Sequence, residues 1–198
     1  MSDNATQTGE GYVDYFAILG LDEKAKPGDV RKAYRRKMKE LVAEIGQAEL
    51  NEEKRSHYLL EMAKLNAALY ILRDTKLRDQ YWKERQELIE LEEAWRRAAE
   101  EGSAEADQLR RTFDTQIRAF LARYMEELML DAGRDKECVE ASNWDAAHER
   151  HASKLLRYFR QSQHQQILER LPYFDFTPIE FDWDERRKTA AALAAGEE

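Results

Sequence analysis

The feature that most constrains this chain is its long stretches without helix-breaking residues. The stretch from Leu77 to Glu101 contains neither glycine nor proline, and all 198 residues include only 8 Gly and 3 Pro. An all-β fold needs many tight turns, for which these two residues are the usual material, so the composition disfavours it. Leu, Ala, Glu, Lys, Arg and Gln dominate the rest, and all are good helix formers. The sequence therefore predicts an all-α protein.

Apolar residues recur at three- and four-residue steps along the first part of the chain, as on one face of an α-helix. A short apolar element covers residues 12–20 and ends at a glycine. The next helix opens at residues 27–29, with Asp29 as the expected N-cap and Gly46 as the expected stop. A third helix is expected over residues 51–73, where the first residue, an asparagine, can cap it and the apolar positions form an a/d seam.

Three longer amphipathic helices follow. One runs from Leu77 to Gly102, and a second carries an apolar stripe over residues 109–128 and ends near Gly133. The last begins after Ser142 or Asn143, either of which can act as its cap. Long helices joined by short loops predict an antiparallel three-helix bundle.

The two ends of the chain have a different character. The segment 172–184 alternates apolar and polar residues, and we expect it to form an extended arm in a groove of this molecule or of a partner. Its large apolar side chains include Phe176, Phe181 and Trp183. Residues 1–11 and 185–198 are expected to be disordered.

The charge balance and the single cysteine limit the environment of the protein. A net charge of -8 disfavours general binding to nucleic acid or to an anionic membrane surface. No apolar run approaches the roughly 20 residues that span a bilayer, and residues 1–11 have no signal-peptide core. Cys138 has no second cysteine to pair with, so we expect a reducing compartment, with the cytoplasm or an organelle interior as the default.

Three blocks of the first half of the chain, in the right order and spacing, resemble a J-domain. They are Asp-Tyr-Phe-Ala-Ile-Leu-Gly-Leu at 14–21, Asp-Val-Arg-Lys-Ala-Tyr-Arg-Arg at 29–36, and Leu-Asn-Ala-Ala-Leu-Tyr-Ile-Leu-Arg-Asp at 65–74 with Arg78 and Tyr81 after it. The resemblance implies a J-like domain over residues 12–82.

The second half resembles the C-terminal three-helix bundle of HscB-type proteins. The residues that carry this resemblance are 87–94, 113–115 and 143–158. HscB-type proteins are J-proteins that deliver an iron–sulfur scaffold protein to a DnaK-type chaperone. The resemblance implies a bundle over residues 83–171 that binds a client. This chain lacks the family's connecting segment between the two parts, which leaves the identity of the client open.

The chain also departs from the J-domain pattern in its essential tripeptide. J-domains carry His-Pro-Asp in the loop after the second helix, whereas the matching positions here are Val42, Ala43 and Glu44. Ala43 does not break a helix as proline does, and the Val42 side chain donates no hydrogen bond. We therefore expect the second helix to continue to about Ile45, and we expect no stimulation of a chaperone ATPase by the usual route.

Basic residues on the second helix are candidates for docking onto a chaperone. The five residues are Arg31, Lys32, Arg35, Arg36 and Lys39. The resemblance implies that this face steers the protein towards an acidic chaperone surface, an effect that is sensitive to salt. The alternative is a charged face that is simply solvated.

Two further groups of residues are candidates for binding sites. Trp82, Leu88, Leu91 and Trp95 either form a client surface or pack between the J-like part and the bundle. His148 and His151 lie three residues apart on a helix, a spacing that suits one metal ion, and Cys138 is a third candidate ligand. No carboxylate pairing accompanies them, so structural histidines are the favoured interpretation, with Cys138 in a loop.

These observations predict a non-enzymatic J-like co-chaperone or adaptor, without a cofactor, that binds a protein partner through its bundle. One alternative is an interaction module of a larger assembly that uses the J fold only as a scaffold. A second is an HscB-like co-chaperone of iron–sulfur assembly. The third is a metal-dependent enzyme built around His148 and His151.

Overall fold

The computed structural model describes residues 11–49, 51–169 and 171. Within these residues the secondary structure is helical and contains no strand, which confirms the predicted all-α class. The helices are α1 (Tyr15–Leu19), α2 (Pro27–Gln47), α3 (Glu52–Leu72), α4 (Thr75–Glu100), α5 (Ala106–Ala122), the π-helical turn η1 (Arg123–Glu127), α6 (Leu128–Ala132), α7 (Lys136–Ser142) and α8 (Ala146–Glu169). None of the described helices is long and apolar enough to cross a membrane.

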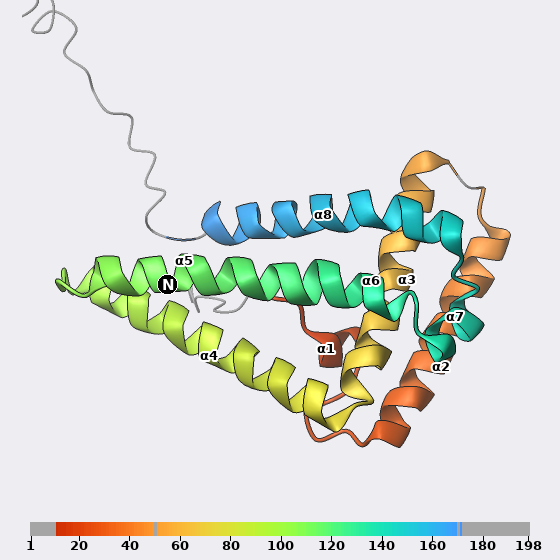
Figure 1. Ribbon diagram of the computed structural model, residues 1–198, viewed down its shortest axis with the longest axis horizontal. Helices are drawn as coiled ribbons and strands as arrows, with labels where there is room; N and C mark the ends of the chain where they lie inside the picture. The colour runs from red at the N-terminus through yellow and green to blue at the C-terminus, as the bar shows by residue number, and fades with distance from the viewer. Residues whose placement is uncertain (1–10, 50, 170, 172–198) are drawn as a thin grey trace, which may run out of the picture.

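Helices α2 and α3 form an antiparallel hairpin at one end of the molecule (Figure 1). The Asn51 side chain accepts the Lys54 amide at 2.8 Å and caps α3 as predicted. The predicted cap of α2 was wrong, because Lys26 is the residue before the helix and the Asp29 carboxylate accepts its amide at 3.2 Å from the first turn. The expected stop at Gly46 was also early, since α2 extends one residue further, to Gln47.

The remaining long helices alternate in direction, with α5, η1 and α6 forming one continuous rod between α4 and α8 (Figure 1). Along α4, Leu88 and Trp95 are buried against this rod, and Trp95 stacks on Phe113 with ring centroids 6.1 Å apart. The hairpin of α2 and α3 crosses the end of this layer. The N-terminal end of α3 projects beyond α8 (Figure 1).

A buried aromatic cluster joins α1 to the long helices. The Tyr15 hydroxyl donates to the backbone carbonyl of Tyr124 within the π turn η1, where the regular helical hydrogen-bond ladder is interrupted. The Tyr81 hydroxyl donates to the Val13 carbonyl at 2.7 Å and accepts the Tyr15 amide at 3.1 Å. The apolar core is therefore continuous from residues 12–82 into residues 83–171, and the position where these two ranges meet lies inside α4.

A buried polar chain ties α7 to the hairpin. The Tyr34 hydroxyl donates to Asn66 Oδ1 at 2.8 Å, Asn66 Nδ2 donates to Ser142 Oγ at 3.3 Å, and Ser142 donates to the Cys138 carbonyl at 2.6 Å. Cys138 is a buried helical residue, so the expectation that it lies in a loop was wrong. These bonds satisfy polar groups that burial would otherwise penalise.

The start of α8 also differs from the prediction. Ser142 ends α7, and Asn143 follows it in the left-handed conformation with φ 54°. Neither residue caps α8. Asp145 takes that role, because its carboxylate accepts the amides of Ala147 and His148, each at 2.9 Å.

Candidate protein-interaction surfaces

The positions that match the J-domain tripeptide lie within an unbroken helix, as predicted. Val42 is half-buried and packs against the core, whereas Ala43 is exposed. Glu44 is also exposed, and its Oε1 accepts the Tyr58 hydroxyl of α3 at 3.0 Å. The only carboxylate among the three positions is therefore engaged within the hairpin.

The same end of α2 borders a shallow groove of about 370 Å³ beside α7. Its lining is mainly apolar and includes two cationic side chains. The lining residues are Arg35, Met38, Lys39, Val42, Ala43 and Ala141. Two of the tripeptide positions therefore line a surface that α7 completes.

The basic face of α2 is partly neutralised by a carboxylate of α7. All five predicted basic residues of this face are exposed. Glu137 Oε1 lies 3.5 Å from Arg31 Nε and 3.6 Å from Arg35 Nη2. Among the described residues, Lys32, Arg36 and Lys39 have no acidic partner within salt-bridge distance. Fewer unpaired positive charges are therefore available on this face to attract an acidic surface than the sequence suggests.

Arg73, the C-cap residue of α3, fixes α7 in this position. Its Nη1 donates to Asp135 Oδ1 at 2.9 Å and to Glu137 Oε2 at 3.0 Å. The hydrogen bonds from Arg73 hold the pKa of Asp135 below its usual range. Glu137 thus lies among three arginines, and its position depends on an ion pair between residues more than 60 positions apart.

The four candidates on the first bundle helix do not form an exposed client surface. Leu88 and Trp95 are each only 2% exposed, and Leu91 is half-buried against the core. Trp82 packs edge-to-face on Phe16 of α1, with centroids 5.4 Å apart. The structure contradicts the client-surface hypothesis for Leu88 and Trp95, because packing between helices buries them.

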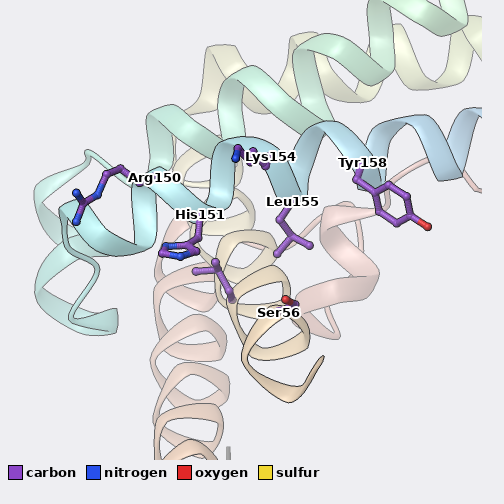
Figure 2. Close-up of a pocket in the computed structure, with 7 residues that line it drawn as sticks. Ser56, Arg150, His151, Lys154, Leu155 and Tyr158 are labelled. Atoms are coloured by element: carbon purple, nitrogen blue, oxygen red, sulfur yellow. The ribbon is translucent and has the colours of Figure 1, made fainter. Parts of the chain in front are cut away.

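A second, larger groove lies between α3 and α8 and has a volume of about 670 Å³ (Figure 2). Two of its lining residues, Ser56 and Leu59, come from the N-terminal half of α3. The others are Arg150, His151, Lys154, Leu155 and Tyr158, which follow one stripe of α8. Figure 2 shows Leu155 pointing from α8 towards Ser56, with Arg150 and Tyr158 at opposite ends of the row.

The α3–α8 groove combines an apolar floor with unpaired positive charge. Tyr158 is 71% exposed, the one large hydrophobic side chain in the described part of the chain with such exposure. Neither Arg150 nor Lys154 has an acidic partner within salt-bridge distance among the residues placed in the structure. Tyrosine and arginine at such a site are characteristic of binding hot spots.

The predicted metal candidates are not brought together. His148 stacks on Trp144 at 5.6 Å, and its Nδ1 lies 2.6 Å from Asp145 Oδ1. His151 is exposed, with Nδ1 2.8 Å from the Ala147 carbonyl, whereas Cys138 is buried in α7. The described residues contain no group of three or more His, Cys, Asp or Glu that could hold a metal ion.

The arm candidates Phe176, Phe181 and Trp183 lie outside the described residues.

Comparison of the chain with protein-family models, with curated proteins and with solved structures found no match. The chemistry of the described surfaces is therefore the basis for assigning a function.

Two residues that shape these surfaces were missed at the sequence level. Glu137 carries no local signal, because its arginine partners belong to α2 and to the C-cap of α3. Tyr158 follows Leu155 at a three-residue spacing typical of an apolar helix face, but the structure leaves it exposed. Helical periodicity places a residue on a face, and only the packing of other elements decides whether that face is covered.

Proposed function

We propose that this protein is a non-enzymatic J-like co-chaperone or adaptor that binds a protein partner in the α3–α8 groove and does not stimulate a DnaK-type chaperone in the usual way. The observation that carries the proposal is the course of α2, which continues as a helix through residues 42–44 to Gln47. A chaperone-stimulating tripeptide needs a loop at this point, and Glu44 instead bonds to Tyr58.

The α3–α8 groove supports the partner-binding half of the proposal. Its apolar residues offer area to bury, while Arg150 and Lys154 favour a partner with acidic groups beside its apolar side chains. The partner class is thus a protein segment that is both acidic and hydrophobic. The lining of the groove includes Ser56 and His151 but no carboxylate that would orient the histidine, so it does not provide a Ser-His-acid arrangement.

An ATPase assay tests the first half. The intact purified chain is added to a DnaK-type chaperone in a single-turnover measurement, with an unaltered J-domain protein as the positive control. We expect the hydrolysis rate to stay at the basal value with this chain. An acceleration approaching that of the positive control would overturn the proposal.

Comparative affinity purification tests the second half. The tagged intact chain is compared with a Tyr158→Ala, Lys154→Glu double variant and with a Lys83→Glu control on α4. Lys83 is exposed and lies outside the groove, so the control repeats the charge change at a different surface. Partners that use the groove should be lost from the double variant and retained by the control, and equal recovery from all three proteins would contradict this assignment.

A specific observation favours the alternative of an interaction module without any chaperone contact. Glu137 neutralises Arg31 and Arg35 on the face that would meet a chaperone. Reversing Lys32 and Arg36 to Glu separates the two functions, because both side chains are exposed. Weaker chaperone binding than in a control with Arg97→Glu and Arg111→Glu supports the co-chaperone, whereas identical binding supports the scaffold.

A further inference from the structure

The end of α8 determines where the last part of the chain starts. Leu171 is only 2% exposed, and its amide donates to the Leu168 carbonyl at 3.1 Å. Leu171 is therefore held in place at the end of α8, and this end of the helix is the one farther from α3 (Figure 1). The remaining 27 residues, 172–198, begin from this anchor.

The sequence that follows has the chemistry that the α3–α8 groove requires. Residues 173–183 contain three acidic residues and no basic one. The acidic residues are Asp175, Glu180 and Asp182. Phe176, Ile179 and Phe181 alternate with or adjoin them, so apolar and acidic side chains are interleaved. The groove offers the complement, with Leu59, Leu155 and Tyr158 beside Arg150 and Lys154.

The distances allow this segment to reach the groove within one molecule. Along α8, Tyr158 lies 11 residues before Glu169, which is ~17 Å at the helical rise. Lys154 is 15 residues before Glu169, or ~22 Å. An extended chain from Leu171 spans ~17 Å by Phe176 and ~35 Å by Asp182. Because Leu171 lies two residues beyond Glu169, roughly 3 Å must be added to both helical distances. The extended backbone then reaches Tyr158 at about residues 177–178, which leaves the neighbouring Phe176 ring within reach of Tyr158, and Asp182 reaches past Lys154.

The face of α8 between Leu171 and the α3–α8 groove carries polar side chains, so an extended chain can lie along it. The stripe that carries Lys154 and Tyr158 continues along α8 through Gln161 and Gln165, both of which are exposed. These polar residues present no bulky apolar obstacle to a passing chain. The large exposed area of Tyr158 is then the part of the described surface that the segment would cover.

We propose that the α3–α8 groove binds residues 173–183 of the same chain, which run antiparallel to α8 and occupy the surface that serves the protein partner. This inference rests on the proposed function, in which the α3–α8 groove binds a protein partner. It adds a form of regulation, because the partner must displace residues 173–183 before it can bind. Tethering makes this binding intramolecular, so a modest affinity suffices to fill the groove.

Disulfide trapping in the intact chain tests the proposal. Ser56→Cys on α3 and Thr177→Cys beside Phe176 introduce thiols by small changes, and Ser56 is exposed. The control pair is Thr112→Cys with Thr177→Cys. The start of α5, which carries Thr112, lies on the same side of the molecule as the end of α8, so a freely moving segment would meet it at least as often (Figure 1). Native Cys138 is buried and should not take part.

We expect an intramolecular disulfide in the Ser56 pair at least tenfold faster than in the control pair. Adding Phe176→Ala or Arg150→Glu should lower that rate towards the control, and 1 M NaCl should act in the same direction because the Debye length falls to about 3 Å. Equal rates for the two pairs would overturn the proposal, as would exclusively covalent dimers. The assay contains no partner, so its failure would leave the proposed function standing.

Discussion

Replacing Tyr81 by Phe isolates the hydrogen bonds that hold α1 against α4. The Tyr81 ring packs on Tyr15 and Tyr124 with centroids 5.3 and 5.1 Å away, and a phenylalanine retains this packing. Only the hydroxyl is lost, and with it the bonds to the Val13 carbonyl and the Tyr15 amide. Burial raises the pKa of Tyr81, so the hydroxyl remains protonated across the neutral range.

The expected cost follows from the two backbone groups that are left behind. Val13 is 8% exposed and Tyr15 is fully buried, so water cannot readily replace the missing hydroxyl. An unsatisfied buried group costs about 1–3 kcal/mol, which gives a loss of about 3 kcal/mol for the pair. For a chain of this length, 1 kcal/mol lowers the Tm by about 2–4 °C, so we expect a decrease of roughly 6–12 °C.

Urea unfolding followed by circular dichroism at 222 nm measures this difference. The denaturant slope should stay constant, because the same surface is exposed on unfolding. Tyr158→Phe is the matched control, and its exposed hydroxyl should contribute less than about 0.5 kcal/mol. A loss below about 1 kcal/mol for Tyr81→Phe would refute the argument that its hydroxyl satisfies two buried backbone groups.

Three further substitutions test the ion pair, a close contact and the course of α2. Asp135→Asn should cost about 1.5 kcal/mol at pH 7, because it loses the charged partner of Arg73. The lowered pKa of Asp135 means that this difference is complete above about pH 4 and disappears as the pH falls further, which urea titrations at several pH values can follow. Gly133→Ala should cost about 1–3 kcal/mol by urea unfolding, because its Cβ would lie 2.7 Å from Trp144 Nε1. Ala43→Pro should cost about 3 kcal/mol and reduce helical circular dichroism, because α2 continues past this position.

Each of these three has a result that would contradict it. A pH-independent difference for Asp135→Asn would mean that the charge of this carboxylate does not matter. Unchanged stability of Gly133→Ala would show that the Trp144 ring moves away without cost. A loss below 1 kcal/mol for Ala43→Pro, with Ala43→Gln as the helical control, would indicate that α2 bends at this position and would weaken the proposed function.

The sequence by itself determined the helices and several of their ends. Helical periodicity and the scarcity of Gly and Pro are local properties, so they predicted the all-α class and the continuous α2 through Val42. The Asn51 cap and the stop of α1 at Gly20 were also predictable, because each depends on the conformation of one residue and its nearest neighbours.

Only the tertiary structure decided which faces of these helices are covered. Trp95 and Leu88 were candidates for a binding surface, yet the α5 rod buries them, while Tyr158 on a similar stripe remains exposed. Glu137 reaches the arginines of α2 only because Arg73 holds α7 in place. The amphipathic pattern of a single helix shows that one of its faces should be buried. Which element covers that face, and which of its residues stay exposed, depends on contacts between residues far apart in the chain.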